Sequence, residues 1–489
     1  MSKRRFRSRL GLVAAVAVAG AVVGPVSAHA AGAQAAGAQS VRADFNGDGY
    51  ADLAVGASYG KVGGHARAGY VSVVYGSSTG LDTSHRQIIS QDTAGIPGGA
   101  ETEDYFGSGL ALGDLDGDGY ADLVVGAGGE DVGSVQNAGT LTVVWGGKQG
   151  LSGGKVVATG VEGDRVNAQS PTIGDFNGDG HPDLATATRL LDGPFTRTAG
   201  AAQSRGLSFD LDYATDDIAA GDVDHDGITD LVALIHDYGE EGEPVNERVV
   251  YLYGSKRGLG APITLKKPGG TKVPGGSSLG IGDVDKDGYA DLVIGRPVDG
   301  SGETPVDSEL IGGQIGVVYG SVNGPDTSRT TVINQNTAGV PGTSEAGDGF
   351  GWGISVADVN GDGYADVAVG SPNEDIGRVA SVGAVTVLRG GRGGLTGTGA
   401  VSFNQNATGV PGTAEQNDFF GSHTALVDTN HDGRAELYVG APGENTFDGS
   451  AWAFRSTGTG PTASGSVSFG PATLGAPVAD ANFGDGFAR

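Results

Sequence analysis

The chain has 489 residues, of which 93 are glycine and none is cysteine. It carries 30 Lys and Arg against 58 Asp and Glu, so its formal net charge is −28. This balance excludes an electrostatic footprint for nucleic acid or anionic lipid, because both require a basic face. Glycine at this density, without the three-residue period of collagen, argues against a helix-rich fold. With no disulfides, an exported form of the chain needs another source of rigidity.

The first thirty residues predict a cleavable signal peptide. Five cations lie in residues 3–9, an apolar run follows at 10–23, and Ala28-His29-Ala30 offers a signal-peptidase site. A membrane span is the alternative, but about 14 apolar residues are too few to cross a bilayer. We therefore expect a secreted, extracellular protein with a signal peptide at 1–30, a flexible linker at 31–40, a folded domain at 41–489 and no membrane anchor.

A nine-residue pattern, Asp-x-Asp/Asn-x-Asp-Gly-x-x-Asp, recurs along the rest of the chain, with Glu in place of the last Asp in its final copy. The seven copies begin at Asp44, Asp114, Asp175, Asp222, Asp283, Asp358 and Asp428. Each copy precedes a strand-like run, such as 122–126 or 366–370. Alternating runs of Val, Tyr and Trp that end in Gly, as at 70–76, 140–146, 249–254 and 315–320, predict half-buried antiparallel strands.

These repeats predict an all-β fold. A unit of about 60 residues with four short strands cannot bury both faces of its sheet alone, whereas radial stacking of such sheets buries them. Seven units therefore predict a seven-bladed β-propeller. The first copy of the pattern lacks a preceding strand, and residues 466–489 offer one around Phe483-Gly484. We expect this C-terminal segment to complete blade one, so that the two ends of the chain share a blade and close the ring.

The residue types of the nine-residue pattern point to metal coordination. Positions one, three, five and nine offer side-chain oxygens, position seven offers a backbone carbonyl, and Gly at position six permits a sharp turn. Such hard oxygen ligands suit Ca²⁺, and up to seven ions are predicted. Loops one to three would use Asp44, Asn46, Asp48, Tyr50, Asp52; Asp114, Asp116, Asp118, Tyr120, Asp122; and Asp175, Asn177, Asp179, His181, Asp183. Loops four to seven would use Asp222, Asp224, Asp226, Ile228, Asp230; Asp283, Asp285, Asp287, Tyr289, Asp291; Asp358, Asn360, Asp362, Tyr364, Asp366; and Asp428, Asn430, Asp432, Arg434, Glu436.

Two alternatives to this interpretation are open. Solvated Asp-Gly turns are common hairpin punctuation and need no ion, although anions crowded into one turn repel each other unless a cation intervenes. The longer Glu436 also leaves calcium binding by the seventh loop open.

With its recurring Phe-Gly pairs, the sequence from about residue 41 to the end resembles the FG-GAP repeat family, which includes the N-terminal propeller of integrin α subunits and bacterial secreted relatives. The pairs are Phe106-Gly107, Phe350-Gly351 and Phe420-Gly421, and Gly-Ser-Pro or Gly-Ala-Pro segments such as 370–372 and 440–442 accompany them. The resemblance implies that the loops bind Ca²⁺ on one propeller face and that ligands contact loops of the opposite face. Unit three, with only 47 residues before the next copy, departs most from the pattern.

The function that these features favour is a secreted calcium-binding propeller that acts as an adhesion or ligand-binding module. We expect a monomer whose partner is an unidentified extracellular protein or carbohydrate. Glu101, Glu345 and Glu415, with the aspartates before each Phe-Gly pair, form either turn caps or an acidic rim for a cationic or carbohydrate ligand.

A hydrolase, or a propeller associated with one, is the alternative function, by resemblance to glycosylphosphatidylinositol-specific phospholipase D. Ser58, Ser78 and Ser278 match the Gly-x-Ser-x-Gly string of a nucleophile elbow. Because nearly one residue in five is glycine, chance matches to this string are expected. None of the three strings lies between a buried strand and a helix. Because the sequence presents no catalytic constellation, we favour a protein that is not an enzyme.

Overall fold

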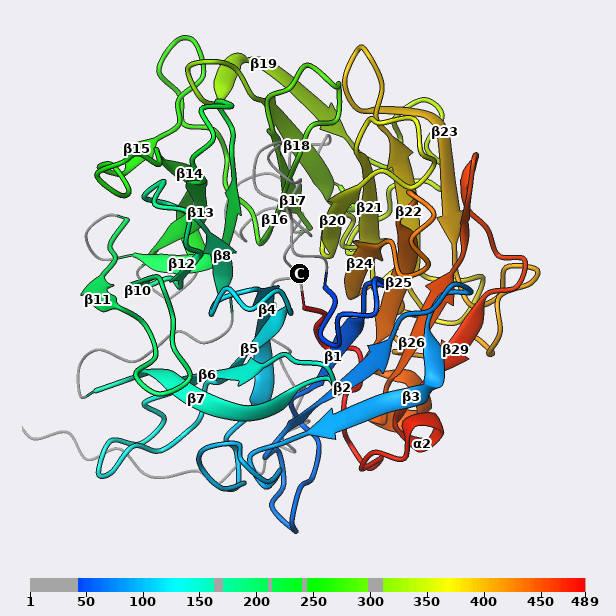
Figure 1. Cartoon of the computed structure of the whole chain (residues 1–489). Helices are drawn as coiled ribbons and strands as arrows, with labels where there is room; N and C mark the ends of the chain where they lie inside the picture. Colours follow the sequence, from blue (N-terminus) through cyan, green and yellow to red (C-terminus); the bar gives the residue numbers. More distant parts are fainter. Residues whose placement is uncertain (1–42, 162–169, 210–212, 240–243, 298–310, 489) are drawn as a thin grey trace, which may run out of the picture.

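Seven antiparallel sheets stand radially around one axis in the computed structural model of the chain (Figure 1). The structure describes residues 43–161, 170–209, 213–239, 244–297 and 311–488. The predicted seven-bladed β-propeller is confirmed. The predicted signal peptide and linker, at residues 1–30 and 31–40, lie outside the described residues. Within the described part of the chain, every helix is too short to cross a membrane.

Each complete blade has four strands, ordered from the axis outward as they occur in the sequence. Blade two contains β4 (Phe106–Gly113), β5 (Asp122–Ala127), β6 (Thr140–Trp145) and β7 (Ser152–Thr159). Blade three contains β8 (Thr172–Gly174), β9 (Asp183–Ala185), β10 (Arg189–Asp192) and β11 (Gln203–Gly206), and blade four contains β12 (Ala214–Gly221), β13 (Asp230–Tyr238), β14 (Pro244–Leu252) and β15 (Ile263–Thr264). Blade five contains β16 (Ser278–Gly282), β17 (Asp291–Arg296), β18 (Gln314–Tyr319) and β19 (Asp326–Ile333).

Blades six, seven and one complete the ring. Blade six contains β20 (Ile354–Ala357), β21 (Asp366–Ser371), β22 (Ala384–Arg389) and β23 (Thr396–Phe403). Blade seven contains β24 (His423–Val427), β25 (Glu436–Ala441), β26 (Ser450–Phe454) and β29 (Val467–Phe469), with the small hairpin of β27 (Ser456–Thr457) and β28 (Gly460–Pro461) between the last two. Blade one contains β1 (Leu53–Ala57), β2 (Tyr70–Tyr75) and β3 (Asp82–Ile89). The short helices α1 (Glu444–Phe447) and α2 (Pro471–Leu474) lie in connections of the C-terminal part.

The hydrophobic core lies between neighbouring blades. One cluster joins Val71 and Val73 of β2 to Phe106 and Leu110 of β4, the innermost strand of the next blade. Equivalent clusters join the other blades that face one another. Because the alternating strands bury side chains on both faces of the sheet, a single blade could not shield them from water.

The Phe-Gly pairs fit the wedge between two blades. Phe106, Phe350 and Phe420 are at most 1% exposed. Gly351, which leads into blade six, has φ +103°, and a Cβ at this position would lie 2.7 Å from the carbonyl oxygen of Gln314 in β18, the third strand of blade five. Phenylalanine therefore fills the gap, while the following glycine adopts a positive φ and lets two backbones approach.

The C-terminal segment closes the ring against blade one, as predicted. Phe487 forms an antiparallel bridge with Val55 of β1, and the Gly56 N–H donates to the Gly486 carbonyl at 2.8 Å. The end of the described chain accordingly lies at the axis (Figure 1). The predicted start of the segment at residue 466 is wrong, because β29 pairs with β26 and completes blade seven.

We predict that Phe487→Ala lowers the free energy of unfolding by about 3–5 kcal/mol, the usual result of emptying a buried phenylalanine site. Phe487 is 3% exposed and packs with Leu53 and Val55. Urea denaturation measures the change. Val467→Ala is the control, because Val467 is 53% exposed and its truncation should alter stability little. Equal stability of the wild type and the Phe487 variant would contradict ring closure by this segment.

Candidate metal centres

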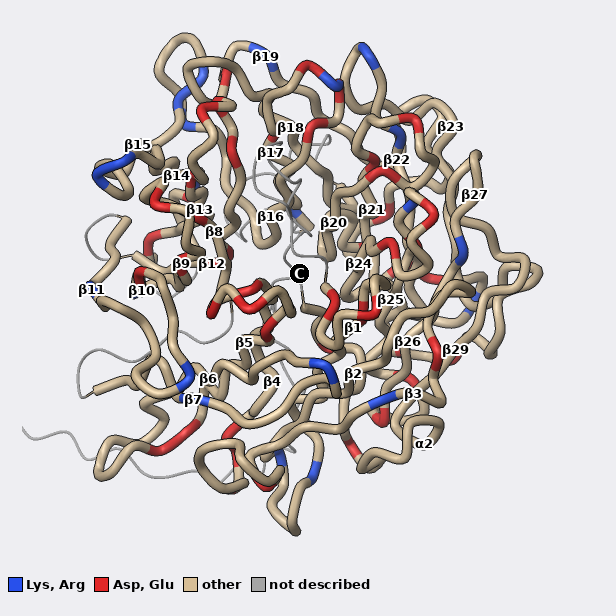
Figure 2. Tube along the Cα trace, viewed as in Figure 1, with Lys and Arg blue, Asp and Glu red and all other residues tan. Residues whose placement is uncertain are grey.

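The seven predicted loops occupy equivalent places in the propeller. In blades two to seven each loop joins the innermost strand to the second strand, and in blade one it leads directly into β1. All seven therefore lie at the same end of the second strands, on one face of the ring. Acidic segments recur from blade to blade around this ring (Figure 2).

The carboxylate at position nine is buried in every loop. Asp122, Asp183, Asp230, Asp291 and Asp366 are fully buried, and Asp52 and Glu436 are at most 2% exposed. One oxygen of this carboxylate accepts the N–H of position two, over 2.8–3.2 Å across the seven loops. In blades one to six its other oxygen accepts a glycine N–H at 2.7–2.9 Å. In five of these blades that glycine directly follows the third strand, and the carboxylate therefore ties the loop to two strands of the blade.

The carboxylate at position one shapes the turn itself. In each loop it accepts the N–H of the glycine at position six, at 2.6–3.0 Å. That glycine has φ between +83° and +94° in all seven loops, a range that side chains strongly disfavour. The glycine at position six therefore has the conformational role that the sequence predicts for it.

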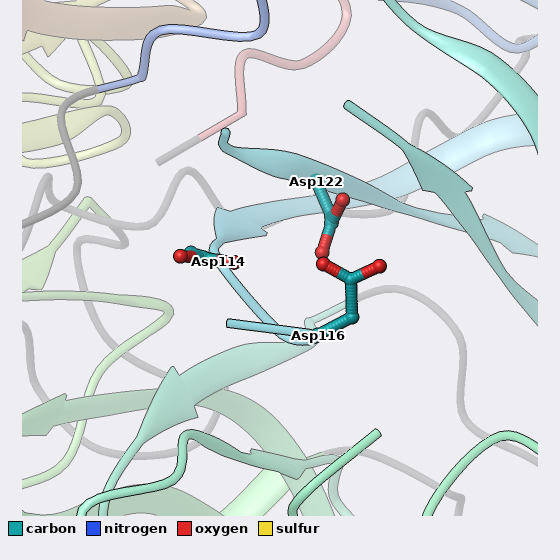
Figure 3. A group of neighbouring side chains, drawn as sticks. All are labelled: Asp114, Asp116 and Asp122. Atoms are coloured by element: carbon teal, nitrogen blue, oxygen red, sulfur yellow. The ribbon is translucent and has the colours of Figure 1, made fainter. Parts of the chain in front are cut away.

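Three loops bring their carboxylates close enough to hold one ion. The clusters are Asp114, Asp116, Asp122; Asp222, Asp224, Asp230; and Asp283, Asp285, Asp291, each with one oxygen per residue within 4.8 Å of the others. In the first cluster Asp116 and Asp122 point toward one another (Figure 3). These are the three loops with Asp at position three, whereas the other four have Asn there.

The residues present fit a hard divalent cation. All the side-chain donors are carboxylate or amide oxygens, the ligands that Ca²⁺ takes. In loop two, Oδ1 of Asp116 is buried and has no hydrogen-bond partner. A buried carboxylate oxygen without a partner is costly unless a cation or another group satisfies it.

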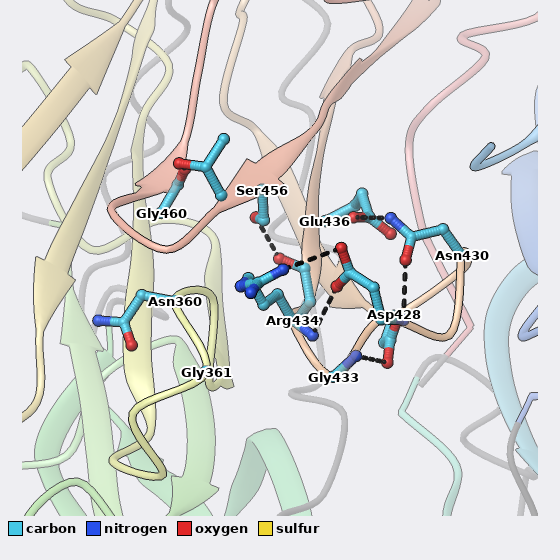
Figure 4. Close-up of polar contacts among 12 residues, drawn as sticks. Asn360, Gly361, Asp428, Asn430, Gly433, Arg434, Glu436, Ser456 and Gly460 are labelled. Atoms are coloured by element: carbon cyan, nitrogen blue, oxygen red, sulfur yellow. Dashed lines mark hydrogen bonds and ion pairs between the residues drawn. The ribbon is translucent and has the colours of Figure 1, made fainter. Parts of the chain in front are cut away.

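The seventh loop uses its longer glutamate differently from the aspartates. Glu436 Oε1 accepts a hydrogen bond from the Asn430 side chain at 2.7 Å (Figure 4). Glu436 Oε2 accepts one from the Thr429 hydroxyl at 3.1 Å. Both oxygens of Glu436 are thus engaged by neighbouring side chains of the loop, one of them a predicted ligand. Calcium binding by this loop stays a prediction, as does the orientation of the position-seven carbonyl in all seven loops.

Neighbouring loops contact each other around the ring. The N–H of position eight in loops two, four, six and seven donates to the position-one carbonyl of the preceding loop, at 2.8–3.0 Å. The Lys286 ammonium of loop five donates to the Asp362 carbonyl of loop six and lies 5.4 Å from the Tyr364 ring centre. Hydrogen bonds therefore join each of these loops to a neighbouring loop of the ring.

Burial raises the pKa of each position-nine carboxyl, because a charged form without a cation loses its hydration. The pKa of Asp52 rises to about 8, those of Asp122, Asp230, Asp291 and Glu436 to about 7, and those of Asp183 and Asp366 to about 6. Neighbouring loop carboxylates raise these pKa values further, whereas the backbone N–H donors oppose the shift. A bound cation would favour the charged form.

The structure adds four side chains that sequence reasoning missed. Guanidinium groups of Arg197, Arg329 and Arg389 contact carboxylates of loops two, five and six, and the Tyr253 hydroxyl donates to Asp226 of loop four at 2.9 Å. In the sequence, Tyr253 and Arg389 could have been found from their position, because each directly precedes the glycine that follows the third strand. Arg197 belongs to blade three and contacts blade two, so nothing local in the sequence marks it.

The serines of the three elbow-like strings do not sit in nucleophile elbows. The Ser58 side chain hydrogen-bonds to Asp485 of the closing segment, and Ser278 donates to the Gly351 carbonyl at 2.7 Å. Ser78 forms a bridge with Gly80 in a turn. Among the described residues, none of these serines precedes a helix.

The fold and its loops define a β-propeller built from repeats with acidic turns. Six segments of the chain match the FG-GAP repeat, at residues 36–74, 106–144, 167–201, 275–307, 350–388 and 420–454. The chain therefore belongs to the FG-GAP repeat family and is similar to integrin α propellers. Blade four, outside the matched segments, has the same four strands and the same loop as the others.

Curated relatives match over part of the chain only. It is 34% identical over 169 residues to phosphatidylinositol-glycan-specific phospholipase D of Bos taurus, which covers 34% of this chain and 19% of that protein. It is 27% identical over 177 residues to integrin alpha-6 of Gallus gallus, which covers 36% of this chain and 14% of that protein. The matches thus span less than a fifth of either relative. Among solved structures, the Dos1 propeller matches with a TM-score of 0.38 and 11% identity, over 79% of this chain and 86% of that one.

We predict that the metal-free protein becomes less stable as the pH rises from about 5 to 8. Its position-nine carboxyls have a raised pKa, so the folded state holds protons that the unfolded state has released, and that stability is lost as the pH passes the folded-state values. Thermal melts of metal-stripped protein in chelator-treated buffers measure the effect.

Calcium-saturated protein is the control for this pH dependence. The ion binds the charged carboxylates, so the melting temperature with Ca²⁺ should exceed the metal-free value most at pH 8. Metal-free melts that are independent of pH, or that shift upward toward pH 8, would contradict the prediction.

Proposed function

We propose that this protein is a secreted calcium-binding β-propeller that acts as an adhesion or ligand-binding module, with Ca²⁺ in a structural role. The observation that carries the calcium proposal is the buried carboxylate at position nine of every loop, with further oxygen donors gathered beside it. Because the ion would bind the folded loop and not the unfolded chain, its binding free energy would become folding free energy. The basic head and apolar run of residues 1–30 support secretion.

The face opposite the loops offers the surface for a partner. The hairpin turns that follow the second strands, such as residues 62–65, 132–135 and 376–379, lie on this face and have exposed tips. The acidic rim of this face consists of Glu101, Asp131, Glu345, Asp375 and Glu415, all exposed. Exposed carboxylates at repeated positions favour a cationic ligand or a carbohydrate with hydrogen-bonding hydroxyls.

The aspartates beside this rim have a structural role in the turns that precede the Phe-Gly pairs. Asp104, Asp348 and Asp418 are buried, and each accepts the N–H of the glutamate three residues earlier, at 2.6–2.7 Å. These aspartates cap turns, which leaves the exposed rim residues as the candidates for ligand contact.

The binding role is tested on an array of glycans and extracellular matrix proteins, probed with calcium-saturated and with metal-stripped protein. We expect a restricted set of ligands that bind with Ca²⁺ and bind more weakly without it, because loss of the ion loosens the ring that holds both faces. The variant Glu101→Gln/Glu345→Gln/Glu415→Gln should lose binding to a cationic ligand.

A double variant on the face that carries the seven loops provides the control. Asp82→Asn and Asp326→Asn remove two half-buried charges where β3 and β19 begin, away from the rim, and should leave ligand binding unchanged. An array without a hit, at protein concentrations that saturate typical adhesion modules, would contradict the proposed role.

A further inference from the structure

Two arginines pair with carboxylates on the face of the ring that carries the seven acidic loops. Arg197 Nε lies 2.6 Å from Asp116 Oδ2, and its Nη2 lies 2.6 Å from Asp118 Oδ2. Arg329 makes the equivalent pair of contacts in loop five, with Asp285 Oδ2 and, at 3.4 Å, with Asp287 Oδ2. In both loops one guanidinium spans the carboxylates of positions three and five.

Each guanidinium is held in place by an aromatic ring of the third strand. Arg329 lies 3.9 Å from the ring centre of Tyr319, and Arg197 lies 5.6 Å from that of Trp145. Arg197 also donates to the Gly146 carbonyl at 3.0 Å. Stacking on the ring already restricts the arginine side chain. Less conformational entropy is therefore lost when its planar guanidinium pairs with the carboxylates.

The two arginines reach their loops from different places in the chain. Arg329 lies on β19, the outer strand of its own blade, whereas Arg197 follows β10 of the neighbouring blade. In blade one, the residue equivalent to Arg329 is His85, which stacks on Tyr75 with ring centres 4.2 Å apart. The same aromatic platform therefore carries a different side chain in different blades.

Loop four provides an internal comparison. Its side-chain donors, Asp222, Asp224, Asp226 and Asp230, match those of loops two and five in type and spacing. Its described contacts include the Tyr253 hydroxyl on Asp226 and no cationic side chain on any of the four carboxylates. The three loops thus differ in one respect that should govern their affinity for a cation, the presence of a fixed positive charge.

We infer that Arg197 and Arg329 are built-in counter-cations, which stabilise loops two and five without metal and make them weaker calcium sites than loop four. This inference rests on the proposed calcium binding and concerns how the loops differ in their affinity for calcium. The arginines are positioning residues, since they would act on the ion through the carboxylates.

The contacts explain why one arginine would both stabilise the metal-free loop and weaken its binding of calcium. Each guanidinium takes outer oxygens of positions three and five, so it screens the repulsion that the other carboxylates exert in the metal-free loop. In loop two, Asp116 Oδ1 stays buried and without a partner, so an ion could still share this residue. That ion would have to bind beside a positive charge, which lowers its affinity.

Calorimetric titration of metal-stripped protein with CaCl₂ tests the inference on the full chain. Arg329→Gln removes the charge from loop five, and Arg197→Gln removes it from loop two. In each variant we expect one binding event to shift from the weak class of sites to a class about tenfold tighter, as expected for removing a charge beside a divalent ion. Adding Asp285→Asn to Arg329→Gln should abolish the tightened event. Binding that is unchanged or weaker in both single variants would overturn the inference.

The control for lost charge is Arg378→Gln. Arg378 is exposed at a hairpin tip between β21 and β22, on the face opposite the loops, so its replacement should leave every calcium affinity unchanged. Equal tightening in this variant would overturn the inference, because it would reveal an effect of net charge alone.

Thermal melts give a second readout. Without metal, Arg329→Gln should lower the melting temperature more than Arg378→Gln does, and saturating Ca²⁺ should remove most of that difference. An equal loss with and without Ca²⁺ would overturn the role as counter-cation. If calcium binds to none of the proteins, including the wild type, the proposed calcium site itself fails, a result distinct from failure of the arginine inference.

Discussion

The burial of one carboxylate per blade is the constraint on which this propeller depends. Each position-nine side chain accepts an N–H from the start of its loop, and in blades one to six a second, from a glycine. Two backbone N–H donors shape the site but do not neutralise the charge, and burial consequently raises the pKa of these carboxyls to about 6–8. A bound cation would stabilise the charged form of these seven buried carboxyls. It would also give rigidity to a chain that has no cysteine and so no disulfide bonds.

This constraint connects the loops to the ring as a whole. The loop carboxylates hold strands of their own blade, and hydrogen bonds between neighbouring loops carry the connection to the next blade. The opposite face is built at the other ends of the same second strands. Order in the acidic loops would therefore help to define the surface that we propose for a partner, although the two faces lie at opposite ends of the strands.

Repetition made the fold and the places of the acidic loops in it predictable. The period of the acidic pattern gives the number of blades, and alternation gives strands such as β2, β6 and β18 with their actual bounds to within a residue or two. The closing segment was recognisable because Phe483-Gly484 repeats the Phe-Gly pairs. Its start was misplaced because β29 lacks a distinguishing pattern, and its pairing with β26 is decided by packing. Arg197 could not be predicted, since its contact with loop two depends on the angle between two blades.

The proposed calcium ions in the acidic turns can be located by diffraction. Crystals of the protein grown in CaCl₂ would be measured at a wavelength where calcium scatters anomalously. We expect anomalous peaks within coordination distance of the carboxylates in loops two, four and five. Ordered water without anomalous signal in all three of these four-aspartate loops, at saturating calcium, would contradict the proposed calcium binding.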